Sequence, residues 1–325
     1  MNVNDPCILT NSELISLSRF TEILSNVHNR VSSRKPSSIS PQLNNNLGKG
    51  LIDKLIIHLP QSMTTEELTL RCKGMGYKVN MHYKRDKRYY MGIDCHSQTI
   101  DCFLGRPNNT ECYKIIINPS KVKLWSMTEL LLIKIFSKSV LESKIYRIDY
   151  TVDIFETYEK ILEGLDIKYK RSTVEFIGGS IRTGLLIGVE NDKISIYNKG
   201  NKEKANFPWT RIERQTTGKA IFIKKLGDLK HSAEQIITYN PLAIITLNNI
   251  HFISDQNLPE GQISKLNELK TLIKFEGYFL GKKKLSKNNN FQRDYGNLFT
   301  LTPYLIQPHE IFNNDISIFF KETIQ

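Results

Sequence analysis

The stretch "YRIDYTVDIF", residues 146–155, decides the fold class, because apolar and polar residues alternate along it. One face would carry Tyr146, Ile148, Tyr150, Val152 and Ile154, and the other Arg147, Asp149, Thr151, Asp153 and Phe155. Strict alternation with β-branched and aromatic residues predicts a β-strand, with Tyr146 and Tyr150 in the core. A polar face is ordinarily the solvated side of an antiparallel sheet, so its meaning depends on the neighbouring strands.

Composition and charge favour a globular protein with a polyanionic partner. The chain has 325 residues, 40% of them hydrophobic and 24% charged, and 45 Lys+Arg against 33 Asp+Glu give a net charge of +12. Such an excess favours nucleic acid, although the abundance of Asn, Ile and Lys would also follow from an AT-rich genome. No apolar run is as long as a membrane span, and the N-terminus lacks the pattern of a secretory signal. We therefore expect a cytoplasmic protein without a membrane partner.

The five cysteines do not form a recognisable framework. They are scattered, and no C-x-x-C pair occurs. This distribution argues against both disulfide scaffolding and a structural zinc site.

The chain divides into three regions by pattern. Residues 1–50 would form a helix at 12–31 and a linker rich in Ser, Pro and Asn. Residues 51–225 read mostly as strands and would form the catalytic domain, and 226–325 would be an α/β region with a role in DNA recognition. The predicted fold class is α+β, with a largely antiparallel central sheet and flanking helices.

Two later strands match the polar face of the first. In "KISIYNK" (193–199) and "WTRIERQT" (209–216), alternate residues are again polar. If the three strands belong to one sheet, one polar face gathers Arg147, Asp149, Asp153, Tyr197, Lys199, Arg211 and Glu213.

These residue types suit the cleavage of a phosphodiester. A tyrosine can attack phosphorus and form a covalent phosphotyrosine, carboxylates hold Mg²⁺ or Mn²⁺, and Arg and Lys bind phosphate oxygens. Each signal also has a simpler interpretation. Tyr197 alone would be a packing residue, and Arg211 with Glu213 an exposed ion pair that contributes little.

The ordered set of strands resembles the replication initiation factor family. The matching runs are "YRIDYTVDIF", "LLIGV", "ISIYNKG" and "WTRIERQ"; the second lacks the tyrosine of the family's "YIG". The family includes rolling-circle replication initiators of plasmids and filamentous phages, and relaxases of integrative conjugative elements. The resemblance covers residues 140–220. It implies a nicking-joining fold related to the HUH endonucleases, with acidic metal ligands, and no His-x-His pair occurs here.

The resemblance implies a metal-dependent DNA nickase and strand transferase, a single-strand endonuclease that initiates rolling-circle DNA replication. Tyr197 would form a 5′-phosphotyrosyl intermediate and leave a 3′-OH primer, assisted by Lys199, Arg147 and Arg211. The metal-binding residues would be Asp149 and Glu213, with Asp153 as a third candidate. Asp149 and Asp153 lie ~13 Å apart on a regular strand, too far to ligate one ion together.

Partners and alternatives complete the expectation. The partners would be double-stranded origin DNA, single-stranded DNA, and the helicase and polymerase of a bacterial host. Whether the protein forms an oligomer stays open. The alternative function is a non-catalytic, sequence-specific DNA-binding regulator. A tyrosine recombinase is set aside, because the only His-x-x-Arg match, "HYKR" at 82–85, lies far from Tyr197. The basic segments at 84–88 and 281–287 would be solvated loops, or else contacts to the DNA backbone.

Overall fold

A computed structural model gives the fold of most of the chain. It describes residues 48–80, 89–94, 100–105, 112–119, 125–136, 140–168, 173–177, 183–234, 240–286 and 290–312. These residues all belong to one compact unit, Leu47–Gln325. The helix predicted at 12–31 lies outside the described residues, whereas Gly48–Gly50, expected in the linker, already form part of the first strand.

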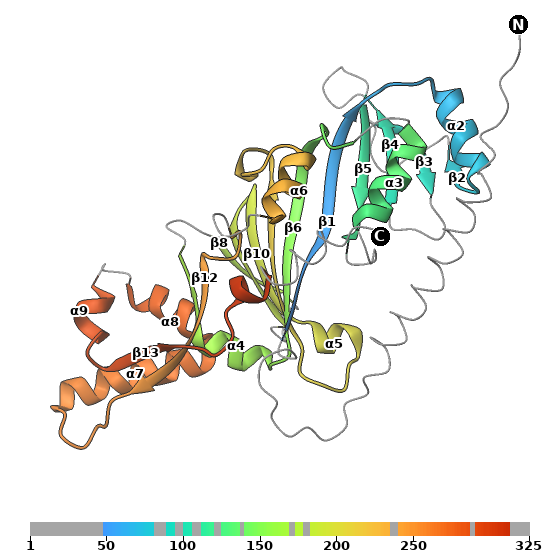
Figure 1. The fold of residues 1–325 in the computed structure, drawn as a ribbon. Helices are drawn as coiled ribbons and strands as arrows, with labels where there is room; N and C mark the ends of the chain where they lie inside the picture. Colours follow the sequence, from blue (N-terminus) through green and yellow to red (C-terminus); the bar gives the residue numbers. More distant parts are fainter. Residues whose placement is uncertain are drawn as a thin grey trace, which may run out of the picture. The chain divides into compact units, whose positions relative to one another are not determined.

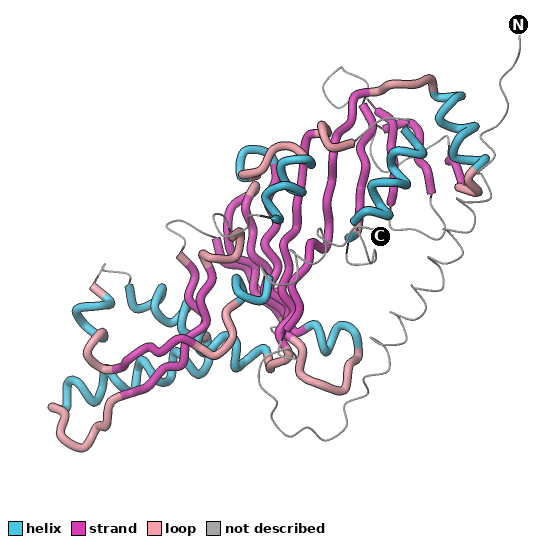
Figure 2. Tube along the Cα trace, in the orientation of Figure 1, coloured by secondary structure: helices cyan, strands magenta, loops and turns pink. Residues whose placement is uncertain are grey.

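A ten-stranded sheet is the main element of the unit (Figures 1 and 2). Its order is β2-β3-β4-β5-β1-β6-β11-β10-β9-β8. The strands are β1 (Gly48–Pro60), β2 (Lys78–Asn80), β3 (Tyr89–Asp94), β4 (Ile100–Gly105), β5 (Cys112–Ile117), β6 (Lys144–Ile154), β8 (Thr173–Ile177), β9 (Gly184–Val189), β10 (Asp192–Asn198) and β11 (Thr210–Thr217). Every pairing between these strands is antiparallel. The predicted α+β class with an antiparallel central sheet is confirmed.

A smaller sheet and several helices complete the unit. The second sheet has the order β13-β12-β7, made of β7 (Leu165–Ile167), β12 (Ile245–Phe252) and β13 (Phe299–Pro303). The helices are α2 (Thr65–Gly74), α3 (Trp125–Phe136), α4 (Tyr158–Gly164), α5 (Lys199–Glu203), α6 (Leu226–Glu234), α7 (Glu260–Glu276), α8 (Tyr278–Leu285) and α9 (Phe291–Tyr295), with a 3₁₀ turn at Gly218–Ala220. In the described part of the chain, no helix has the length and apolar character needed to cross a membrane.

The described part of the basic segment at 281–287 is mostly helical rather than a solvated loop. Residues 281–285 belong to α8, where Gly281 is buried and Lys282 donates hydrogen bonds to the Asp166 carboxylate at 3.0 and 3.3 Å. Lys284 pairs with Glu276 at 2.8 Å. The run therefore begins on a buried helix turn. The other basic segment, 84–88, lies outside the described residues.

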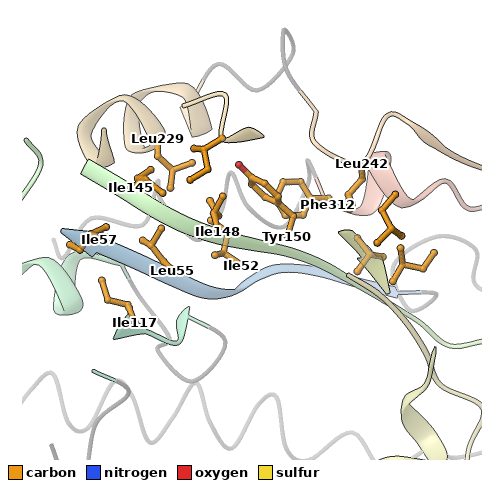
Figure 3. Packing of buried hydrophobic residues seen from close by; sticks show 14 of the residues in the cluster. Ile52, Leu55, Ile57, Ile117, Ile145, Ile148, Tyr150, Leu229, Leu242 and Phe312 are labelled. Carbon is orange, nitrogen blue, oxygen red and sulfur yellow. The ribbon is translucent and has the colours of Figure 1, made fainter. Parts of the chain in front are cut away.

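The apolar face of β6 forms the centre of the core. Ile148, Val152 and Ile154 are fully buried, and Tyr150 meets Phe312 edge-on with ring centroids 5.7 Å apart (Figure 3). Gly50 on the neighbouring strand allows this approach, since a Cβ there would lie 2.5 Å from Cα of Phe312. Burial of such side chains is the main stabilising term of the fold.

Residues beyond 225 also enter this core. Leu229 and Leu242 lie in the same cluster as the β6 side chains (Figure 3). A second cluster is built from α7, α8, α9 and β13, and includes Leu266, Leu269 and Phe291. The proposed boundary at 225 stays a prediction, but side chains on both of its sides share one core.

The expectation for Tyr146 is wrong. Its side chain is 45% exposed and stacks on His58, with ring centroids 4.6 Å apart. The cause is a register shift: Arg147 pairs with Ile56 and Ile145 with Ile57, so Tyr146 is an extra residue between two paired ones. Such a bulge breaks the alternation on which the prediction depends. Tyr150, beyond the bulge, is buried as expected.

Candidate active site

The three strands of the predicted polar face are direct neighbours in the sheet. β11 lies between β6 and β10, and its residues pair with both. Arg211 is opposite Asp153 on one side and Tyr197 on the other. Directly opposite residues in antiparallel strands point to the same face. The structure therefore brings the predicted residues of β6, β10 and β11 together, while their roles remain predictions.

Arg211 and Asp153 form a buried pair at the centre of this face. Arg211 Nε donates to Asp153 Oδ1 at 2.6 Å and Nη2 donates to Oδ2 at 2.7 Å, a bidentate geometry. Both residues are nearly fully buried. Arg211 Nη1 also donates to Asp53 Oδ1 at 3.2 Å. Burial lowers the pKa of Arg211, but its bonds with Asp153 and the charges of both carboxylates outweigh that effect and raise it. Arg211 is therefore a fixed cation.

Lys199 joins the same cluster from the start of α5 rather than from β10. Its Nζ lies 3.5 Å from Asp153 Oδ2 and 4.3 Å from the centroid of the Trp209 ring. Burial lowers the pKa of Lys199, and Asp153 partly offsets this shift. A second cation thus lies beside Arg211.

Arg147 and Asp149 form a separate pair on the same face of β6. Arg147 Nε donates to Asp149 Oδ1 at 2.8 Å and Nη2 to Oδ2 at 2.6 Å. Burial raises the pKa of Asp149, and Arg147 opposes the rise. Both carboxylate oxygens of each aspartate are thus engaged by a guanidinium, a condition that the sequence did not reveal.

Glu213 lies between the two pairs without a partner of its own. Its cross-strand neighbours are Thr151 and Ser195, and among the described residues its carboxylate accepts no hydrogen bond and forms no ion pair. Burial, and then the charges of Asp149 and Asp53, raise the pKa of Glu213. Arg211 and Arg147 oppose this rise only in part, so the half-buried carboxylate favours a proton or a cation.

Tyr197 is held as a neutral phenol. Burial raises its pKa to about 12, against the lowering effect of Arg211. Lys202 of α5 lies 5.3 Å from the centroid of its ring. Its hydroxyl is therefore protonated near neutrality, with two cations nearby.

Asp53 is the residue of this site that the sequence analysis missed. In β1, Ile52 pairs with Tyr150 and Lys54 with Asp149, so Asp53 is an extra residue in the ladder. The bulge turns Asp53 toward Arg211. The signal was the adjacent pair Asp53-Lys54 inside the apolar run "LIDKLII", which is typical of a bulge.

The donor set fits a hydrated Mg²⁺ or Mn²⁺ better than a closed metal cage. In the part of the chain that the structure describes, no three His, Cys, Asp or Glu side chains converge closely enough to hold an ion. Mg²⁺ commonly uses only one or two carboxylates and completes its shell with water and substrate phosphate. Glu213 has free oxygens, and the hydroxyl of the fully buried Thr151, directly opposite, has no hydrogen-bond partner among the described residues. This unpartnered oxygen beside a carboxylate is compatible with a cation bound nearby.

The likeness of this chain to known proteins is weak. No family model matches the chain, and no curated protein matches it. One solved structure, the rolling circle replication initiator protein from Geobacillus stearothermophilus, is 16% identical with a TM-score of 0.38, over 83% of this chain and 97% of that chain. A likeness at this level carries no weight for function, which is argued below from the geometry of the site.

Proposed function

We propose that the chain is a replication initiator or relaxase that nicks one strand of origin DNA with Tyr197. The observation that carries this proposal is the direct cross-strand pairing of Tyr197 with Arg211, a cation fixed by Asp153 and Asp53. This pairing supports the proposal because the tyrosine proposed as nucleophile and the guanidinium proposed to bind phosphate are neighbours on one sheet.

The chemistry assigned to Tyr197 is transfer of a phosphoryl group. Its phenol oxygen attacks the phosphorus, the bond from phosphorus to O3′ breaks, and the products are a 5′-phosphotyrosyl link and a free 3′-OH. Because the pKa of the phenol is about 12, the proton passes to water as the new bond forms, and O3′ takes up a proton from water as it leaves. Arg211 stabilises the negative charge that develops on the phenol oxygen.

Arg211 and Lys199 are suited to bind the scissile phosphate. A guanidinium has five N–H donors, and the bonds from Arg211 to Asp153 and Asp53 use three of them. The remaining donors, together with the Lys199 ammonium, can bind phosphate oxygens. Arg147 is bound to Asp149 and would act by keeping that carboxylate in place.

A divalent cation would be held by Glu213 with Asp149 or Asp53. It would neutralise charge on the non-bridging phosphate oxygens. Asp153 is the weakest candidate ligand, because two hydrogen bonds from Arg211 and the nearby Lys199 ammonium already occupy its oxygens.

The proposal is tested with a supercoiled origin plasmid and Mn²⁺. Wild-type protein should give a nick with covalently attached protein, and Tyr197→Phe should bind the origin but give neither. Tyr146→Phe, which removes the hydroxyl of an exposed tyrosine on β6, is the matched control and should nick normally. An adduct with Tyr197→Phe would assign the nucleophile to another tyrosine, such as Tyr89 or Tyr90.

A second function, a non-catalytic DNA-binding regulator, is favoured by one observation. Asp149 and Asp153 are both already neutralised by bidentate arginines. In that case the wild-type protein binds the origin, yet no adduct forms at any Mn²⁺ concentration. For either function the partners would be origin DNA and single-stranded DNA, and for the initiator also a host helicase and polymerase.

A further inference from the structure

Three aromatic side chains form a cluster beside the candidate active site. Phe207 and Trp209 stack with ring centroids 5.7 Å apart and an interplanar angle of 15°. Phe155 meets Phe207 edge-on at 5.9 Å and lies 6.3 Å from Trp209. We call Phe155, Phe207 and Trp209 the aromatic platform.

The platform lies at the end of β6 and β11 where the catalytic residues are found. Thr210 pairs with Ile154, so Trp209 and Phe155 flank the last rungs of the ladder. The Lys199 ammonium lies 4.3 Å from the Trp209 ring centroid and 3.5 Å from Asp153 Oδ2. One cation therefore contacts both the platform and the carboxylate that fixes Arg211.

The exposure of Phe155 and Phe207 is not explained by the core. Phe155 is 40% and Phe207 44% exposed, and neither belongs to a hydrophobic core cluster. A single exposed aromatic residue is ordinary, but two exposed rings packed on a third, the half-buried Trp209, are typical of a binding surface.

The chain holds the platform in place. Gly200 N–H donates to the Trp209 carbonyl at 2.9 Å, and Ala205 N–H donates to the Gly200 carbonyl at 2.8 Å. A Cβ at Gly200 would lie 3.0 Å from the Phe207 carbonyl oxygen, so the segment before β11 packs closely on α5. A surface that is already ordered loses little entropy on binding.

We propose that the aromatic platform stacks an unpaired nucleobase of the DNA strand next to the phosphate bound by Arg211 and Lys199. This inference rests on the proposed function and specifies its substrate at the platform as single-stranded. In a duplex the faces of a base are covered by its neighbours, whereas an unpaired base offers both faces to an aromatic ring. Lys199 contacts the Trp209 ring, and Lys202 and Lys204 follow it within or directly after α5, so the backbone of the same strand would pass along α5.

The test uses Trp209 as its own reporter. The chain has two tryptophans, Trp125 and Trp209, so Trp125→Phe leaves the platform tryptophan alone. This variant is titrated in EDTA, which prevents metal-dependent cleavage, with a single-stranded origin oligonucleotide, the same oligonucleotide scanned with abasic positions, and the duplex. We expect the single strand to quench the fluorescence of Trp209. The quenching should be lost when the oligonucleotide is abasic at one particular position, and the duplex should quench little.

Binding of a labelled oligonucleotide by platform variants gives a second measurement that does not need Trp125→Phe. Phe207→Ala should weaken binding of the single strand at least about fivefold. This factor is the low end of what stacking of a base on an aromatic ring contributes to affinity. Phe207→Tyr keeps a ring and should bind like wild type. Phe275→Ala removes a 72% exposed phenylalanine of α7 and should have no effect.

The outcomes separate the platform from the nicking reaction. If the single strand binds without quenching Trp209, or if no abasic position matters and Phe207→Ala binds normally, the platform proposal is wrong even when the plasmid is nicked. If quenching and the loss with Phe207→Ala occur but no adduct forms, base stacking stands and the proposed nickase fails.

Discussion

Arg211 on β11 and Asp153 on β6 face each other across one rung of the ladder and are joined by two hydrogen bonds of 2.6 and 2.7 Å. The pair is buried, and it aligns the guanidinium with Tyr197 on the opposite neighbouring strand. The guanidinium that we propose to bind phosphate is thus built into the sheet rather than carried on a loop.

Breaking this pair should destabilise the fold. Asp153→Asn leaves a buried guanidinium with less compensation, which costs about 3–5 kcal/mol in comparable pairs. The free energy of unfolding in urea measures the loss. Glu163→Gln, which breaks the exposed pair of Lys160 and Glu163, should cost less than about 1 kcal/mol. If Asp153→Asn and Glu163→Gln lower the free energy of unfolding equally, the buried pair stabilises the fold no more than the exposed one.

Removing the charge of Glu213 should stabilise the protein at neutral pH. The pKa of Glu213 is raised in the folded state, so folding favours its protonated form. Below its ordinary value of 4.5 both states are protonated and no penalty exists; as the pH rises through the folded pKa, stability falls. Glu213→Gln should therefore gain about 0.5–2 kcal/mol at pH 7 and nothing below the ordinary value. A gain that is independent of pH would contradict this explanation.

The carboxylates should differ in their effect on Mn²⁺ binding. Glu213→Gln and Asp149→Asn should abolish cleavage and weaken Mn²⁺ binding, measured by titration calorimetry. Asp53→Asn should also weaken it, because Asp53 adds negative charge beside Glu213. Asp153→Asn should alter Mn²⁺ affinity least, once folding has been checked by circular dichroism. If Asp153→Asn has the largest effect on affinity, the assignment of ligands is wrong.

Replacing a lysine of α5 and replacing one of α8 should affect the salt dependence of DNA binding differently. Replacing Lys202, beside Tyr197, by Ala should remove one phosphate contact and lower the slope of log affinity against log salt by ~0.7 for a single strand. Lys282→Ala should leave the slope unchanged, because this lysine is bonded to Asp166. Anisotropy titrations between low and high salt measure both. If the two variants show equal slopes of log affinity against log salt, the DNA strand does not pass along α5.

The polar face was predictable because strict alternation fixes which side of a strand a residue faces. β6, β10 and β11 keep that alternation through Asp149, Tyr197 and Arg211, and the structure makes them neighbours. The sequence could not show that arginines occupy both aspartates, since that depends on side-chain geometry. Asp53 was missed and Tyr146 was wrongly predicted to be buried for the same reason: each lies in a bulge between β1 and β6.

The aromatic platform shows a different limit. Phe155 and Trp209 lie directly after β6 and directly before β11, where they continue the polar side of the predicted alternation. Phe207 has no place in that alternation. Its stacking on Trp209 follows from the tight return of the chain through Gly200, which is a property of three-dimensional packing.

The bulge at Asp53 has a consequence for how this site relates to its scaffold. Ile52 is already opposite Tyr150 and Lys54 opposite Asp149, so a chain that lacked residue 53 would continue the ladder without interruption, and every other side chain of β1 would keep its face. The ladder between β1 and β6 would be more regular without this residue, whose contribution is the carboxylate that accepts a hydrogen bond from Arg211. A one-residue deletion inside a central strand usually shifts the register and turns the following side chains to the other face of the sheet. Here we expect it to remove one carboxylate and to leave the pairing of β1 with β6 in place.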